Sequence, residues 1–94
     1  MEQQRISTLL KLMSNPDRLT MLLMLLEGDR NINELAAAIG RPAPIASNHL
    51  TKLRAEGIVD FTRYHRVLEY RLTSPQAQAV LHTLRTLQSP THLS

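Results

Sequence analysis

The sequence predicts one mainly α-helical domain that carries a small β-hairpin. Leucine occupies 17 of the 94 positions and glycine only three, a composition that favours helices. Apolar residues recur at helical spacing up to residue 56, alternate with polar ones between 58 and 72, and then return to helical spacing. A chain of 94 residues holds one hydrophobic core, so we expect a single domain over residues 1–94.

Two helices are predicted at the N-terminal end. A first amphipathic helix over residues 2–13 follows from the i, i+3, i+4, i+7 spacing of Ile6, Leu9, Leu10 and Met13. Asn15, Pro16 and Asp17 have the residue types of an N-cap and a first helical turn, so a second helix should span 16–27. That segment is apolar almost all round, which indicates a helix in the centre of the core.

A short break separates a third helix from a fourth. Either Asn31 or Asn33 can cap a third helix over residues 34–39, which Gly40 would close. A fourth helix is expected from about Pro44 to Glu56, because an apolar stripe recurs through Ala46, Leu50 and Leu53. Two helices joined in this way indicate a helix-turn-helix.

A hairpin and a last helix complete the chain. Two β-prone runs, 58–61 and 67–72, flank a basic tip at residues 63–66 and predict a β-hairpin. Ser74 and Pro75 can then open a last helix that reaches about residue 88. A helix-turn-helix followed by a hairpin is the winged-helix arrangement, so the predicted fold is a winged helix-turn-helix of five helices plus a wing.

The positive charge of the chain is concentrated in this region. The net charge is +3, and residues 41–71 alone hold six Lys and Arg against three Asp and Glu. The rest of the chain carries five residues of each sign and is neutral. A localised basic segment over a helix pair and a hairpin favours a polyanionic partner.

A winged helix places its fourth helix in the major groove of double-stranded DNA, and its hairpin tip reaches the neighbouring backbone. With the apolar stripe turned inward, Ser47 and Asn48 face outward and have side chains that can read base edges. Basic side chains of the fourth helix and the tip would hold phosphates. The residues expected to contact DNA are Arg41, Pro44, Ser47, Asn48, Thr51, Lys52, Arg63, His65 and Arg66.

Four segments resemble one known family. Residues 10–19 (LKLMSNPDRL), 33–36 (NELA), 47–59 (SNHLTKLRAEGIV) and 71–73 (RLT) are similar to the ArsR/SmtB transcriptional repressors, a resemblance that covers roughly residues 6–88. It implies a homodimer, built from the first and last helices, that binds inverted-repeat operators. It also implies release from DNA when a metal ion binds, as in many members.

The metal ligands of that family are missing here. The thiolate pair at the start of its third helix corresponds to Asn31 and Asn33, and a neutral amide is a poor substitute for a thiolate. The ligands of its last helix correspond to Ser74, Gln76, Leu87 and Pro90. We therefore expect neither metal site and no cofactor. The inducing signal stays open: a metal held by His and carboxylates, a small organic ligand, or none.

Other departures concern the histidines and the wing tip. His65 stands where the family has a glycine, and a histidine adopts positive φ less readily, so the tip is expected to differ in shape. His49 lies beside the apolar stripe and is interpreted as structural. His82, on the last helix, could meet its symmetry mate in a dimer and act as a switch, against the simpler interpretation of a packed or solvated side chain.

The dimer prediction also rests on the two terminal helices, whose apolar stripes exceed what one small core needs. The residues expected at the dimer interface are Ile6, Leu9, Leu10, Met13, Leu81, Leu84 and Leu87.

Composition and motifs argue against several classes of protein. The sequence has no nucleophile–base constellation and no glycine-rich phosphate loop, so we do not expect an enzyme. It has no cysteine, which excludes disulfides and thiolate sites. The polar start and the absence of a long apolar run predict a cytoplasmic protein. The predicted function is a homodimeric transcriptional repressor that binds DNA; the alternative is a winged-helix protein-interaction module without DNA binding.

Overall fold

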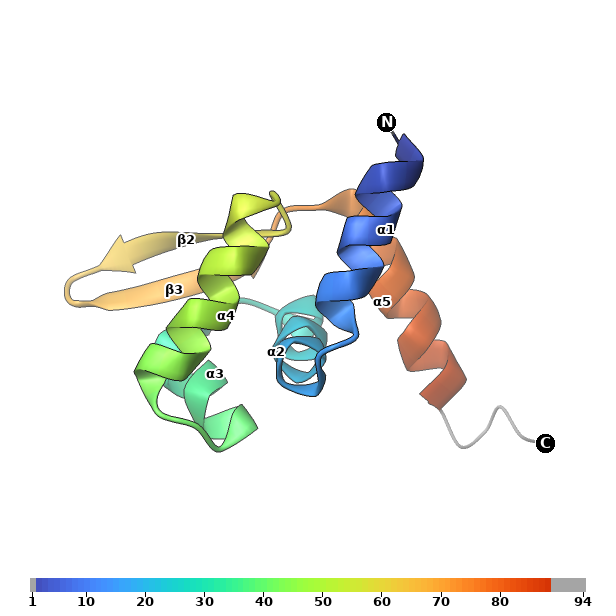
Figure 1. Cartoon of the computed structure of the whole chain (residues 1–94). Coiled ribbons are helices and arrows are strands. Elements are labelled where there is room, and N and C mark those ends of the chain that lie inside the picture. The colour runs from blue at the N-terminus through green and yellow to red at the C-terminus, as the bar shows by residue number, and fades with distance from the viewer. Residues whose placement is uncertain (1, 89–94) are drawn as a thin grey trace.

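The computed structural model describes residues 2–88, and in this range it contains five helices and three strands (Figure 1). The elements in chain order are α1 (Glu2–Met13), α2 (Pro16–Glu27), β1 (Arg30–Asn31), α3 (Ile32–Ile39), α4 (Ala43–Ala55), β2 (Val59–Tyr64), β3 (Val67–Leu72) and α5 (Pro75–Gln88). The predicted class, a mainly α winged helix-turn-helix, is confirmed. None of the helices in residues 2–88 is long and apolar enough to cross a membrane.

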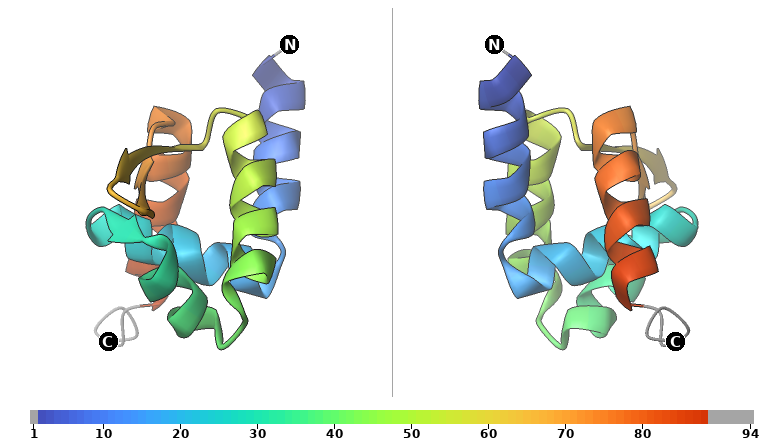
Figure 2. Two further views of the ribbon diagram at one scale, coloured as in Figure 1. Left: turned by 90° about the vertical axis from the view of Figure 1, so that its left-hand side faces the viewer. Right: turned by 90° about the vertical axis from the view of Figure 1, so that its right-hand side faces the viewer.

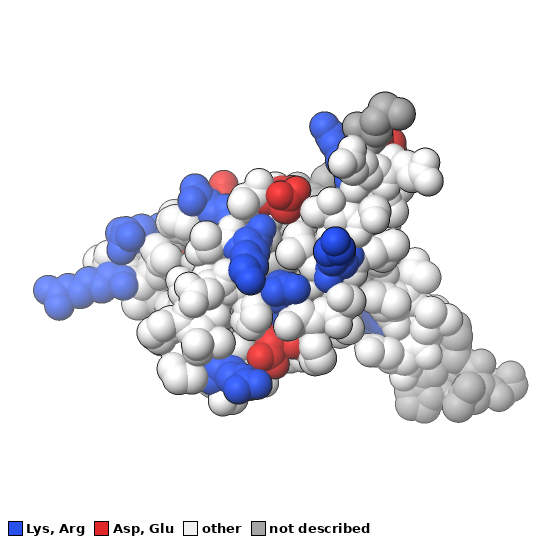
Figure 3. Space-filling view, in the orientation of Figure 1, with Lys and Arg blue, Asp and Glu red and all other residues white. Residues whose placement is uncertain are grey.

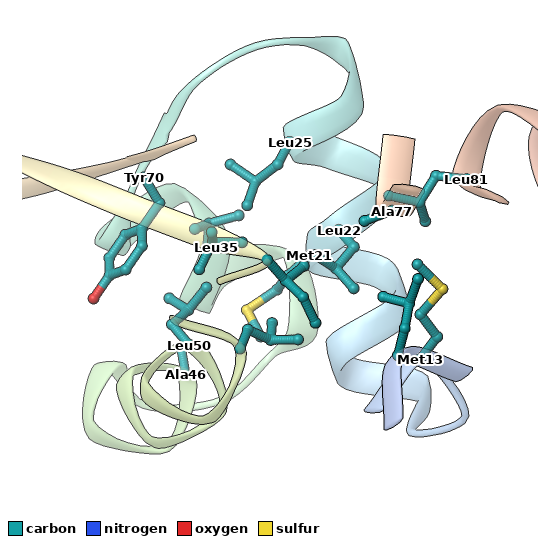
Figure 4. Close-up of a cluster of buried hydrophobic side chains, with 14 of the residues drawn as sticks. Met13, Met21, Leu22, Leu25, Leu35, Ala46, Leu50, Tyr70, Ala77 and Leu81 are labelled. Atoms are coloured by element: carbon teal, nitrogen blue, oxygen red, sulfur yellow. The ribbon is translucent and has the colours of Figure 1, made fainter. Parts of the chain in front are cut away.

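Helix α2 is the centre of the core, as its apolar surface predicts. Met21 and Leu22 are completely buried, and α2 contacts α1, α3, α5 and β3 (Figure 4). Side chains from the surrounding helices, including Leu35, Leu50 and Leu81, pack around it and are also fully buried. One continuous core therefore holds the helix-turn-helix, the base of the wing and the last helix together.

The two helices of the helix-turn-helix begin differently. Asn31 caps α3, because its side chain accepts from the Glu34 N–H while the Glu34 carboxylate accepts from the Asn31 N–H, both at 2.9 Å. The helix therefore begins at Ile32, two residues before the predicted start. Helix α4 begins after Pro42, which supplies no side-chain cap.

The wing belongs to a three-stranded antiparallel sheet in the order β1-β3-β2, whereas the sequence predicted only the hairpin. The additional strand, β1, pairs Arg30 with Tyr70 at the base of the wing. Tyr64 pairs with Val67, which leaves His65 and Arg66 as a two-residue turn. His65 has a φ of 57°, so the histidine adopts the left-handed conformation that we expected it to resist.

The wing and the terminal helices lie on opposite sides of the molecule (Figures 1 and 2). α1 and α5 together line the side remote from the wing tip, and Gln76 donates a hydrogen bond to the Glu2 carboxylate between their first turns. This side is therefore formed by the first and last helices, separately from the hairpin.

Three residues of the predicted dimer interface are buried within their own chain. Leu9, Met13 and Leu81 are no more than 5% exposed, because they pack in the core of their own chain. The predicted interface residues that keep exposed surface are Ile6, Leu10 and Leu87, at 42%, 50% and 65%, together with the half-buried Leu84.

Candidate nucleic-acid interface

Helix α4 is held in a defined rotation by its buried stripe. Ala46, Leu50 and Leu53 are completely buried, so the opposite side of the helix is turned to solvent. On that side Asn48, Thr51 and Lys52 are exposed, while Ser47 is half-buried on the flank. The rotation predicted from the apolar stripe therefore agrees with the structure.

A polar cluster fixes α4 to the junction between α1 and α2. The Arg18 Nε donates to the Leu12 carbonyl at the end of α1 at 2.8 Å, and the Arg18 Nη1 lies 3.3 Å from the His49 Nδ1 on α4. The His49 Nε2 lies 3.9 Å from the Asp17 Oδ2, which also accepts from the Arg41 Nε at 3.3 Å. One arginine therefore connects the end of α1 to the outward-facing helix.

The cluster needs a neutral His49. A guanidinium can only donate, so the His49 Nδ1 must accept and the proton must lie on Nε2, on the side of Asp17. Burial lowers the pKa of His49, and the positive charge of Arg18 lowers it further. These contacts support the interpretation of His49 as a structural residue.

The base of the wing is fixed to α4 by charged and aromatic contacts. The Arg54 Nε donates to the Asp60 Oδ1 at 2.8 Å, and the Arg54 guanidinium lies 4.4 Å from the centre of the Phe61 ring. The hydrogen bond from Arg54 is the main reason that the pKa of Asp60 lies below its usual range. From β3, the Arg71 Nη1 donates to the Thr62 Oγ1 at 2.8 Å. These contacts set the direction in which the hairpin leaves the core.

The cations of residues 41–71 fall into two groups. Arg41, Arg54 and Arg71 each form an ion pair with an aspartate. Within residues 2–88, the other three form no ion pair and have exposed side chains; they are Lys52, Arg63 and Arg66. Figure 3 shows Lys and Arg side chains distributed over α4 and along the wing on one face of the molecule. Lys52, Arg63 and Arg66 therefore leave positive charge on this face available to a polyanion.

The predicted DNA-contacting residues form two groups in space. The first group lies along α4 and at its N-terminal end: Arg41, Pro44, Ser47, Asn48, Thr51 and Lys52. The second group lies at the end of the hairpin: Arg63, His65 and Arg66. The hairpin carries its tip away from α4 (Figure 1), so the two groups can contact neighbouring but different parts of a duplex.

Two exposed residues of this face and the half-buried Arg18 were not among the predicted site residues. Ile45 on α4 and Tyr64 before the turn are 42% and 57% exposed, although both are large and mainly apolar. The residues expected to contact DNA were mainly polar or charged, so neither Ile45 nor Tyr64 was among them. Arg18 was missed because its two partners, Leu12 and His49, come from different helices.

No group of three or more His, Cys, Asp or Glu able to hold a metal ion occurs within the described residues 2–88. Asn31, one of the positions that correspond to family ligands, instead caps α3. His82 is exposed on α5, and Pro90 lies outside the described residues.

Comparisons with known proteins agree with this geometry. Residues 15–60 match the family model described as bacterial regulatory protein, arsR family. The chain is 37% identical over 82 residues to the biofilm growth-associated repressor of Xylella fastidiosa, covering 87% of this chain and 72% of that protein. It is 33% identical over 79 residues to the transcriptional activator HlyU of Vibrio cholerae, covering 84% of this chain and 73% of that protein.

The solved structures include reduced HlyU from Vibrio cholerae, which superimposes with a TM-score of 0.88 at 30% identity and covers 93% of this chain and 92% of that chain. The similarity therefore includes both terminal helices and the wing as well as the helix-turn-helix. The Xylella and Vibrio relatives are both regulators of transcription, one a repressor and one an activator.

Proposed function

The chain belongs to the ArsR family of bacterial transcriptional regulators, and we propose that it acts as a homodimer that binds an inverted-repeat operator and represses transcription. The proposal rests on two features found together: an outward-facing polar side of α4, and three exposed cations on α4 and the wing tip that form no ion pair among residues 2–88. Polar groups on a helix can read base edges, and cations nearby can hold the phosphates.

Each part of this face has its own role in the proposal. Ser47 and Asn48 read bases in the major groove, with Asn48 suited to adenine. Lys52 holds a phosphate beside the groove, while Arg63 and Arg66 contact the backbone reached by the wing. Arg54 and Arg71 are engaged at the base of the wing and act by fixing its direction.

The second copy is proposed to dock on the side formed by α1 and α5. Ile6, Leu10 and Leu87 expose between 42% and 65% of their surface there, and covering them would remove apolar area from water. A two-fold axis at this side would direct both α4 helices to the same DNA. Their half-sites should then lie about 34–36 Å apart, or a multiple of one helical turn.

The test is a titration of a fluorescent duplex taken from the region upstream of the gene, against a scrambled duplex of equal length. Chelator is present, and the salt concentration is varied. We expect tight, sequence-preferring binding whose affinity falls steeply as salt rises. In vitro transcription from the same region should then be reduced when the protein is added.

Equal and weak binding to both duplexes would contradict the proposal and favour a protein-interaction module. Tight binding with increased transcription would support operator recognition and contradict repression. The titration separates these results because it measures binding independently of its effect on transcription.

A further inference from the structure

The first turn of α4 is unusually apolar for the end of a helix that we propose to read DNA. Pro42 and Pro44 have no N–H group, and the Ile45 N–H donates to the Pro42 carbonyl at 3.0 Å. No side chain caps this end of the helix. The turn therefore offers DNA few hydrogen-bond donors or acceptors, and its main exposed features are methyl and methylene groups.

Ile45 is the large apolar side chain that this turn leaves in solvent. It is 42% exposed, whereas Ala46, Leu50 and Leu53 on the same helix are completely buried. On a helix it precedes Asn48 by three positions and Lys52 by seven, so the three residues share one flank. This flank continues the surface proposed for base and phosphate contacts.

Resting on the proposed DNA binding, we propose that Ile45 packs against the C5-methyl group of a thymine in each half-site and thereby selects thymine at that position. Among the base edges in the major groove, the thymine methyl is the apolar group, and an aliphatic side chain is its natural complement. Asn48 then reads a neighbouring base by hydrogen bonds, so the two residues divide apolar and polar recognition along one flank.

The test removes the methyl group from the DNA rather than from the protein. A preferred duplex is first selected from a random pool with the wild-type chain. Each thymine of that duplex is then replaced by deoxyuridine, which lacks only the C5-methyl, in both half-sites together. Dissociation constants are measured for the wild type and for Ile45→Ala, with Ile45→Val as the conservative variant.

We expect one symmetry-related pair of thymines at which the replacement weakens wild-type binding about fourfold per half-site, or roughly 16-fold for the pair. The same replacement should change the affinity of Ile45→Ala less than about 1.5-fold, with Ile45→Val intermediate. Because Ile45 is partly exposed, Ile45→Ala should fold, and a circular dichroism melt checks this for each variant.

A preferred duplex whose binding is indifferent to every thymine replacement would overturn the role of Ile45 and leave the proposed function intact. A loss of affinity on thymine replacement that is equally large in Ile45→Ala would also overturn the role of Ile45, because another group would then contact the thymine methyl. Failure to select any preferred duplex would instead contradict the proposed function, and the role of Ile45 with it.

Discussion

The wing side and the α1–α5 side of this small domain differ in the side chains that they leave without a partner. On the wing side, Lys52, Arg63 and Arg66 are exposed and form no ion pair within residues 2–88. On the other side, Ile6, Leu10 and Leu87 expose aliphatic surface. The first surface suits a polyanion, and the second suits a partner that can cover apolar groups.

The same core supports both surfaces. Helix α2 lies between them, with Met21 and Leu22 completely buried. Arg18, at the start of α2, contacts the end of α1 through the Leu12 carbonyl and α4 through His49. The two sides therefore expose different side chains but are joined through α2 and Arg18. Substitutions can be made on one side without changing the exposed residues of the other.

The largest effect is expected when the apolar side is made acidic. Leu10→Glu combined with Leu87→Glu would place four carboxylates in the proposed dimer, while both positions are exposed in the single chain. We expect sedimentation to show a monomer and operator affinity to fall by about 100-fold or more, because avidity between half-sites is lost.

The matched control is Asn33→Glu, which adds an acidic residue at an exposed position of α3. It should leave the sedimentation coefficient unchanged. A double variant that remains dimeric would place the pairing surface elsewhere.

The next largest effect is expected from removing charge on the wing side. Lys52→Ala combined with Arg66→Ala should lower operator affinity roughly tenfold and reduce the salt dependence by about two contacts per protomer. Sedimentation should still show a dimer. An unchanged affinity and salt slope would favour the protein-interaction alternative.

A smaller effect, on stability, is expected from replacing Arg18, which connects the two sides. Arg18→Met leaves the Leu12 carbonyl and the His49 Nδ1 without this donor, so the free energy of unfolding should fall by about 1–3 kcal/mol. A thermal melt measures this loss, and Lys11→Met, at an exposed position of α1, is the control. Equal melting temperatures for the two variants would show that the cluster around Arg18 does not stabilise the fold.

The smallest expected effect is the pH dependence of stability that His49 contributes. The pKa of His49 lies below its ordinary value of 6.5, so the unfolded chain takes up the proton first as pH falls. The contribution of His49 to stability is therefore fully present above pH 6.5 and is lost as the pH falls below it. The loss stops once the pH is low enough to protonate His49 in the folded chain too. The melting temperature should fall between pH 7.5 and 5.5, and less so in His49→Gln. An identical fall in the two proteins would assign the pH dependence to other groups.

The helix boundaries were predictable where the chain carries clear stop and start residues. α2 begins at Pro16 after Asn15, and α5 begins at Pro75 after Ser74, as predicted. β1 was not predictable, because two residues show no periodicity and their partners in β3 are distant in the sequence. The positive φ of His65 is imposed by the two-residue turn and overrides the preference of a histidine.

The surfaces were predictable only in part. The apolar stripe of α4 fixed which of its residues face solvent, because all of that stripe is buried in one core. The apolar stripes of α1 and α5 could not show which of their residues are buried within the chain and which remain exposed. Leu9 and Leu81 are examples of the first kind, and Leu10 and Leu87 of the second.

In the proposed complex, two copies of α4 and the wing read two half-sites of one operator. Hydroxyl-radical footprinting of the selected duplex tests it most directly. We expect two symmetric protected segments whose centres lie about one helical turn apart, or a whole number of turns. A single protected segment, or uniform protection along the duplex, would contradict it.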